Sequence, residues 1–198
     1  MKCIPTIHIR SPIRTAIAVL AVAAVPAGAV AVPALAGPAT TVTAAATCPT
    51  GWGSLPEAST FQGVGHLTDV RTGRHGCFDR IVFDIDGKPS WFRVQYVPDI
   101  SSVGEGKPIP VRGGAKLAIV LLTPSYDETN HYTYDPANYD ELTNVSGYRT
   151  FRQVVSAGSF EGETTIGLGV RARLPFRVFT LAGSGSTSRV VVDVAHSW

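Results

Sequence analysis

Two aspartates at alternate positions are the first residues whose spacing could support chemistry. In the stretch Phe83-Asp84-Ile85-Asp86 the carboxylates of Asp84 and Asp86 are expected on one strand face, about 7 Å apart along the strand. Paired carboxylates at such a separation can act in glycoside hydrolysis. The simpler interpretation is the solvated face of a strand whose other face, with Ile81, is buried. No motif ties a further acid to the pair.

The histidines lack the spacing of a metal or catalytic site. Beyond the N-terminal region they are His66, His75, His131 and His196, and none lies at i, i+2 or i+4 from another. Neither H-x-E nor H-E-x-x-H occurs, although His66 and His75 could still meet across a hairpin. A G-x-S-x-G nucleophile turn and a phosphate-binding P-loop are also missing. We therefore predict no catalytic residue, no metal ligand and no cofactor.

Tyrosines and short polar residues gather in one long segment, residues 123–150. Sugar rings offer apolar C–H faces and hydroxyl edges, which flat rings and Asn or Asp side chains complement. The alternative is that the tyrosines fasten a long loop to the domain, with their hydroxyls bonded to the backbone. The candidate ligand-binding residues are Tyr126, Asp127, Asn130, Tyr132, Tyr134 and Tyr139.

Other charged residues have a structural and a functional interpretation. Arg171 and Arg173 could form a clamp for a carboxylate, or they could lie on an exposed turn. Asp79 and the pair Arg189 and Asp193 are most simply explained as cross-strand or turn-capping charges.

Short β-strands must position all these residues. The segments rich in Val, Ile, Phe and Thr are 64–71, 78–86, 91–97, 109–111, 116–122, 151–157, 163–170, 176–181 and 189–194. Turn residues such as Gly and Pro separate them, and no helical period extends over a dozen residues. The pattern predicts an all-β fold, an antiparallel sandwich or barrel, with 78–86 and 188–194 as central strands. Glycines within 162–169 indicate a bulge or a close backbone approach.

The N-terminal residues have the pattern of a secretory signal. Lys2, Arg10 and Arg14 precede an apolar run, and small residues offer cleavage after Ala36 or after Ala46. We predict a signal peptide and small-residue linker over 1–46, one domain over 47–198, and a secreted, extracytoplasmic protein without a membrane span in the mature chain. An uncleaved anchor and a lipid on Cys48 are the alternatives.

The remaining cysteines and the charge balance agree with export. Cys48 and Cys77 form an even pair, for which a disulfide is expected outside the cytoplasm, with a free or lipidated Cys48 left open. Closing that loop would stabilise the fold by about 3–4 kcal/mol on the chain-entropy model. Without the signal the 17 basic residues fall to 14, against 15 acidic ones. A near-neutral chain without a basic run predicts no nucleic-acid partner.

Six motifs together carry a resemblance to a known family. They are Gly-Trp-Gly-Ser (51–54), Gly-Arg-His-Gly-Cys-Phe-Asp-Arg-Ile-Val-Phe-Asp (73–84), Phe-Arg-Val-Gln-Tyr-Val (92–97), Ser-Phe-Glu-Gly-Glu-Thr-Thr-Ile-Gly-Leu-Gly (159–169), Pro-Phe-Arg-Val (175–178) and Arg-Val-Val-Val-Asp-Val (189–194). This set resembles the AMIN-like domain of secreted actinobacterial proteins and lipoproteins. The resemblance implies a β-sandwich similar to the AMIN domain, which targets cell-wall amidases to peptidoglycan. It supplies no catalytic residues, and no amidase sequence follows here.

Three functions follow as hypotheses. The first is a secreted, non-enzymatic module that binds peptidoglycan or a related cell-wall glycan through the tyrosine-rich loop. The second is a module that binds another exported protein, through a free sheet edge or through the strand 162–169. The third is a cell-wall hydrolase that uses the face of Asp84 and Asp86 or the scattered histidines.

Overall fold

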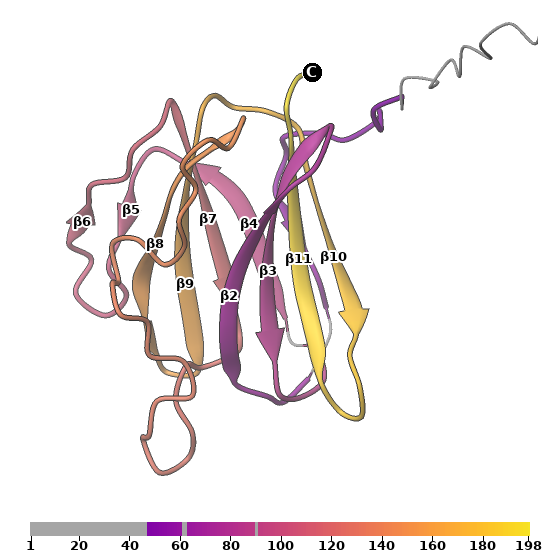
Figure 1. The fold of residues 1–198 in the computed structure, drawn as a ribbon. Helices are drawn as coiled ribbons and strands as arrows, with labels where there is room; N and C mark the ends of the chain where they lie inside the picture. The colour runs from indigo at the N-terminus through magenta and orange to yellow at the C-terminus, as the bar shows by residue number, and fades with distance from the viewer. Residues whose placement is uncertain (1–46, 61–62, 90) are drawn as a thin grey trace, which may run out of the picture. The chain divides into compact units, whose positions relative to one another are not determined.

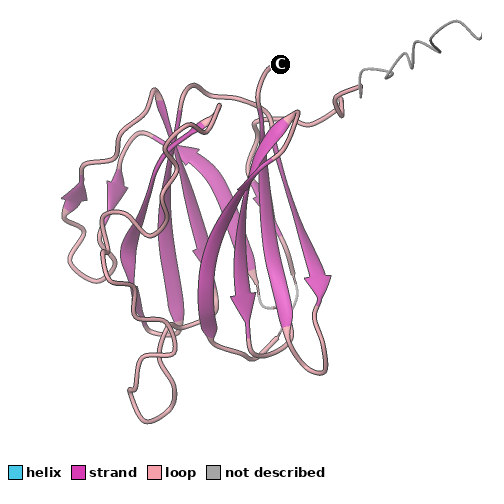
Figure 2. Ribbon diagram, in the orientation of Figure 1, coloured by secondary structure: helices cyan, strands magenta, loops and turns pink. Residues whose placement is uncertain are grey.

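The computed structural model of the protein describes residues 47–60, 63–89 and 91–198. The predicted signal peptide and linker, residues 1–46, lie outside the described residues. Over the described ranges the regular secondary structure consists of strands, with no helix, as Figure 2 shows. No helix that could cross a membrane therefore occurs in this part of the chain.

Two antiparallel sheets face one another (Figure 1). The five-stranded sheet has the order β1 (Glu57–Ala58), β4 (Phe92–Val97), β7 (Ala115–Leu121), β9 (Glu163–Val170) and β8 (Phe151–Phe160). The four-stranded sheet has the order β10 (Phe176–Ala182), β11 (Ser188–Ala195), β3 (Phe78–Ile85) and β2 (Leu67–Arg74). A small pair, β5 (Ile100–Ser101) with β6 (Pro108–Ile109), flanks the larger sheet. The predicted all-β sandwich is confirmed.

The core lies between the two sheets, and the alternation of the strands explains it. In β3, Ile81, Phe83 and Ile85 are buried on the inner side, and in β11 the inward residues are Val190, Val192 and Val194. The opposite sheet adds Leu117, Ile119, Leu121, Ile166 and Leu168. A strand presents every second side chain to the same face of its sheet. The apolar residues at alternate positions of these strands therefore point into the space between the two sheets and fill it.

The two central strands were predicted correctly. β3 and β11 are neighbours in the middle of the four-stranded sheet, and Val82 lies opposite Val191. The predicted strand 64–71 starts too early, because β2 begins at Leu67. The short strands β1 and β5 were missed, since two residues are too few to show an alternation.

Two glycines of β9 lie where neighbouring segments pack closely against the backbone of this strand. A Cβ atom on Gly167 would lie 2.8 Å from a methyl carbon of Val155 and 2.9 Å from a side-chain carbon of Ile100. A Cβ atom on Gly169 would likewise collide with the backbone carbonyl oxygen of Arg112. β9 is also hydrogen-bonded on both sides, to β7 and to β8, so the suggestion that this strand is free to pair with a partner was wrong.

The long loop 123–150 closes one open side of the sandwich, between the edge strands β2 and β8 (Figure 1). Toward β2, Thr133 Oγ1 donates to the carbonyl of Leu67 and the Tyr148 hydroxyl donates to Thr72 Oγ1. Toward β8, the Leu142 amide donates to the carbonyl of Val154. The segment is therefore a structural wall as well as a candidate binding loop.

The N-terminal arm covers the other side. Cys48 is joined to Cys77, which immediately precedes β3, so the predicted disulfide is confirmed. Further along, the Phe176 amide donates to the carbonyl of Gly53, and the Val178 amide donates to Glu57 Oε2. The arm thus caps the edge of β10 before β1 pairs with β4.

Candidate functional site

Asp84 and Asp86 are held in separate ion pairs. Arg71, from the neighbouring strand β2, donates to both carboxylate oxygens of Asp84, at 2.5 and 3.1 Å. Asp86 lies just beyond β3, where Oδ1 accepts the amide of His66 and Oδ2 lies 3.1 Å from its Nδ1. The strand thus places the carboxylates as charges facing solvent and bound to cationic partners, the simpler of the two sequence interpretations.

The four histidines are distributed over different parts of the described chain. His66 lies beside Asp86, His75 stacks on Phe78, and His131 lies in the long loop. His196 follows β11, with Nε2 3.1 Å from Asp79 Oδ1. His66 and His75 stand before and after β2, so they do not meet across a hairpin. Residues 47–60, 63–89 and 91–198 contain no group of three His, Cys, Asp or Glu side chains placed to hold a metal ion.

A groove of about 310 Å³ opens at the end of the sandwich where β2 and β9 begin. Its lining is Gly63, Val64, Gly65, His66, Leu122, Pro124, Tyr126, Asp127, Glu128 and Gly162. The apolar part of the lining is well exposed to solvent: Val64 is 83% and Leu122 is 43% accessible. His66 and two carboxylates, Asp127 and Glu128, add the polar groups. Such a surface offers apolar contact beside hydrogen-bonding groups.

Only two of the predicted site residues, Tyr126 and Asp127, line this groove. The other lining residues come from the segment before β2, the residue after β7, the long loop itself and the β8–β9 turn. Sequence reasoning missed them because Val64, Leu122 and Gly162 are ordinary residues of separate segments. No local signal marks them, since only the packing of the two sheets brings these segments together.

The groove also holds one electrostatic cluster. Nδ1 of His66 lies 3.1 Å from Asp86 Oδ2, and Nε2 lies 3.4 Å from Glu128 Oε1. The hydrogen bond that the His66 ring donates to Asp86 raises the pKa of His66 above its usual value, burial opposes this effect, and the charges of Asp86, Glu128 and Asp127 add to it. The imidazole therefore links the segment before β2, the end of β3 and the long loop, as an ion pair when it is protonated.

We expect this link to depend on pH in a defined direction. Because the pKa of His66 is raised in the folded state, its stabilising contribution is complete below the usual histidine pKa of 6.5 and disappears as pH rises through the folded value. Titration of the His66 ring signals by NMR should give a pKa above 6.5 in the wild type and a lower one in Asp86→Asn. Equal values in the two proteins would contradict the assignment.

Two tyrosines of the long loop are partly buried and contact other segments of the domain. The Tyr126 hydroxyl accepts a hydrogen bond from the Gly162 amide at 3.3 Å, which ties the loop to the β8–β9 turn. Tyr134 packs against the main core, and burial of its ring raises the pKa of the phenol to about 12. These two residues behave as the fasteners that one sequence interpretation predicted.

Two further loop tyrosines, Tyr132 and Tyr139, face solvent. Tyr132 is 67% and Tyr139 is 46% accessible. A β-bridge places Tyr132 opposite Tyr126, and the Tyr139 hydroxyl donates to Asp135 Oδ1 at 2.8 Å. This hydrogen bond, with smaller contributions from desolvation, the charge of Asp135 and nearby Tyr132, raises the pKa of Tyr139 to about 12. Exposed ring surface therefore continues from the groove along the loop.

Asp127 and Asn130 shape the tip of the loop. Asp127 Oδ1 accepts hydrogen bonds from the amides of Thr129 and His131 and from the Thr129 hydroxyl. These donors, the Thr129 hydroxyl first, lower the pKa of Asp127. Asn130 has a φ of +61°, a left-handed conformation that Asn adopts more readily than most residues. The turn fixes the approach of Tyr126 to Tyr132.

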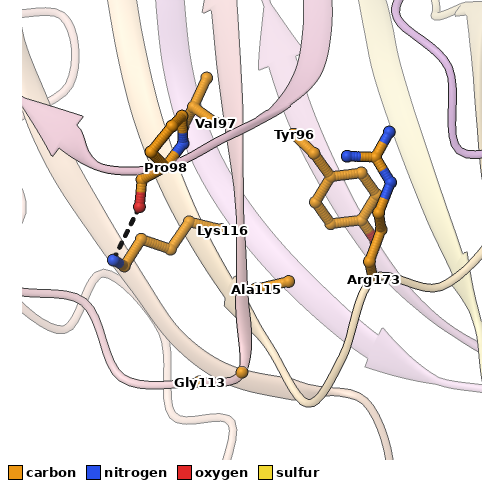
Figure 3. A pocket seen from close by; sticks show the side chains of 8 residues that line it. Tyr96, Val97, Pro98, Gly113, Ala115, Lys116 and Arg173 are labelled. Atoms are coloured by element: carbon orange, nitrogen blue, oxygen red, sulfur yellow. Dashed lines mark hydrogen bonds between the residues drawn. The ribbon is translucent and has the colours of Figure 1, made fainter.

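A second pocket, of about 370 Å³, lies between β4, the start of β7 and Arg173 (Figure 3). The guanidinium of Arg173 covers the ring of Tyr96 at 4.8 Å and donates to Ser54. Lys116 Nζ donates to the carbonyl of Pro98 and pairs with Asp99. Because the ring face is already covered and the cations already have partners, this pocket offers less free binding surface than the groove.

These features define a disulfide-linked β-sandwich module with an open groove at one end. The chain belongs to the AMIN-like domain family, whose model matches residues 65–196. This membership indicates a module associated with the cell wall, and it is consistent with an extracytoplasmic location, as is the disulfide. Comparisons with curated proteins and with solved structures returned no significant match.

Proposed function

We propose that this chain is a secreted, non-catalytic module that binds cell-wall glycan, peptidoglycan or a related polymer. The observation that carries the proposal is the groove beside the exposed tyrosines, on a domain of the AMIN-like family. Carboxylates bound to Arg71 and His66 in place of a free acid pair support a binding role over hydrolysis.

The contact surface would extend from the groove to Tyr139. The rings of Tyr126, Tyr132 and Tyr139 would lie against the C–H faces of successive sugar rings, and apolar Val64 would widen the platform. Glu128, which is exposed and pairs only with His66 among the described residues, would accept hydroxyl hydrogen bonds. Asn130 and Asp127 hold the loop tip, and Tyr134 would act indirectly by packing the loop onto the core.

Removing the two exposed rings should abolish most of the wall binding without unfolding the domain. We expect the double variant Tyr132→Ala, Tyr139→Ala to bind purified, deproteinised cell wall about tenfold or more weakly, because each stacked ring contributes on the order of 1 kcal/mol. Co-sedimentation of residues 47–198 with the wall measures this effect.

Trp198→Ala is the matched control, because Trp198 is an aromatic residue even more exposed than the two tyrosines and lies near Arg173, away from the groove. Wall binding that is unchanged in the tyrosine variant would exclude the loop as the contact. Release of soluble wall fragments into the supernatant would favour the hydrolase hypothesis. Loss of all binding on removal of wall proteins would favour the alternative, a module for another exported protein.

A further inference from the structure

The charged side chains divide between the two ends of the sandwich. At the end where β2, β9 and β11 finish and β3, β8 and β10 begin, here called the basic end, lie Arg74, Arg149, Arg152, Arg171 and Arg173. The opposite end, which contains the groove, carries Asp86, Asp127, Glu128, Glu161 and Glu163. Five arginines thus gather at the basic end, whereas the groove end combines its carboxylates with Lys88 and Arg189.

The carboxylates nearest the basic end are buried or already have a partner. Asp193 is fully buried and paired with two arginines, and Glu141 pairs with Arg112. Asp79 is also fully buried, behind the ring of His196. Over residues 47–60, 63–89 and 91–198, no carboxylate lies within 4 Å of the guanidinium of Arg149 or Arg171. These two positive charges are available to an external anion.

An open hollow of about 500 Å³ brings the two arginines together, with His196 and Ser197 as its other walls. Arg171 Nη2 donates to the carbonyl of His196 at 2.6 Å, which fixes that guanidinium beside the C-terminal segment. Arg149 makes only a long contact of 3.5 Å, to the carbonyl of Gly76. The remaining N–H groups of both guanidiniums form no other hydrogen bond within the described residues.

The imidazole of His196 forms one wall of the hollow and is held in place by two protein oxygens. Its Nδ1 lies 3.2 Å from the carbonyl of Gly76 and its Nε2 lies 3.1 Å from Asp79, so both ring nitrogens face protein oxygens. The ring is a wall of the hollow and holds the segment on which Arg171 depends. The cationic side chains of the lining are those of Arg149 and Arg171, and Ser197 adds a hydroxyl donor.

We propose that this hollow is a binding site for a phosphate group. Two guanidinium forks that face one space offer more N–H donors than one carboxylate can accept, whereas a phosphate has the additional oxygens and the second negative charge to satisfy both. The site is separate from the glycan groove, at the opposite end of the strands. It would give the module a second contact with an anionic component of its surroundings.

Inorganic phosphate is the first probe. Titration of residues 47–198 with potassium phosphate, against potassium chloride at equal ionic strength, can be followed through the arginine Nε–Hε signals in NMR spectra. We expect saturable shifts for Arg149 and Arg171 with phosphate alone. The double variant Arg149→Gln, Arg171→Gln should bind at least about tenfold more weakly, since it removes several charge-assisted hydrogen bonds.

Arg93→Gln, Arg189→Gln is the matched control, because it removes the same charge elsewhere and should leave the affinity unchanged. Equal shifts in chloride, equal affinity in both double variants, or equally tight binding of succinate would overturn the proposal. If the first double variant is less well folded, Arg149→Gln alone provides the same test. The tyrosine variant should bind phosphate normally, so failure of the glycan proposal would leave this result intact.

The phosphate group could be carried by a lipid headgroup or by a soluble molecule or wall polymer. Vesicles of phosphatidylglycerol and vesicles of neutral phosphatidylcholine separate these sources. Sedimentation with phosphatidylglycerol alone, lost in the Arg149→Gln, Arg171→Gln variant, would assign the lipid. Phosphate binding without vesicle binding would assign the soluble or polymeric source, and either result supports the site.

Discussion

Replacing Asp79 by Ala is expected to lower the free energy of unfolding by about 3–5 kcal/mol. Asp79 lies at the start of β3 with no accessible surface. Its Oδ2 accepts the backbone amides of Thr150 and Phe151, at 2.6 and 3.1 Å, and its Oδ1 lies 3.1 Å from His196 Nε2. The substitution would leave two buried N–H groups without an acceptor.

Urea unfolding of residues 47–198 would measure this change. Asp79→Asn should be less costly than Asp79→Ala, because an amide oxygen of the same shape can still accept both amides. Asp86→Ala is the control on the same stretch, and its effect should stay below about 1 kcal/mol, because Asp86 is 44% exposed. Similar losses for Asp79→Ala and Asp86→Ala would show that Asp79 does not hold the sheets together.

Asp193→Ala should destabilise the protein by about 3 kcal/mol, the second largest loss that we expect. Asp193 lies in β11 on the outer face of the four-stranded sheet, yet it is fully buried. Arg80 donates to both of its oxygens at 2.6 and 2.9 Å, and Arg177 donates to Oδ2 at 2.9 and 2.8 Å. Without the carboxylate, two positive charges would stand close together with no counter-ion.

Aromatic rings explain why the carboxylate of Asp193 is shielded from water although it points away from the core. The guanidinium of Arg177 lies 4.5 Å from the ring centre of Trp52, and both arginines lie over Phe179. Rings over guanidinium groups add cation–π attraction and exclude water. Asp193→Ala should therefore also loosen the N-terminal arm, which would appear as faster amide exchange near Trp52.

A comparable ion pair on the same sheet provides the control. Asp84 also accepts two hydrogen bonds from one arginine, Arg71, but their side chains are 27% and 48% exposed. Asp84→Ala should cost less than about 1 kcal/mol, because water already surrounds the pair. The prediction for Asp193 would be wrong if both variants unfolded at the same urea concentration.

The strands could be predicted because their signal is local. In β3 and β11 the alternation of apolar residues assigns each side chain to a face, and the disulfide followed from an even pair of cysteines. The ends of the strands were predicted less accurately than the strands themselves. β2 starts at Leu67 because the preceding segment packs against Gly87, where a Cβ on Gly65 would lie 2.7 Å from the Gly87 backbone.

The groove and the hollow were beyond sequence reasoning. Val64, Leu122 and Gly162 line the groove together although they belong to three separate segments. Arg171 and Arg173, considered as one clamp, are directed to different places: Arg171 toward His196, and Arg173 toward Ser54 and Tyr96. Sequence spacing gives the distance along a strand or turn, but not which distant segment packs beside it.

The all-β class, the two central strands and the family could be predicted from residue types at short, regular intervals, and the even pair of cysteines favoured a disulfide that the structure confirms. The roles of the charged residues, in contrast, depend on contacts that the sequence does not reveal. Asp79, Asp84 and Asp193 belong to similar strand sequences, yet their environments range from a buried cap to an exposed pair. That difference arises because burial is set by partners more than 70 residues away, such as Thr150 for Asp79 and Arg80 for Asp193.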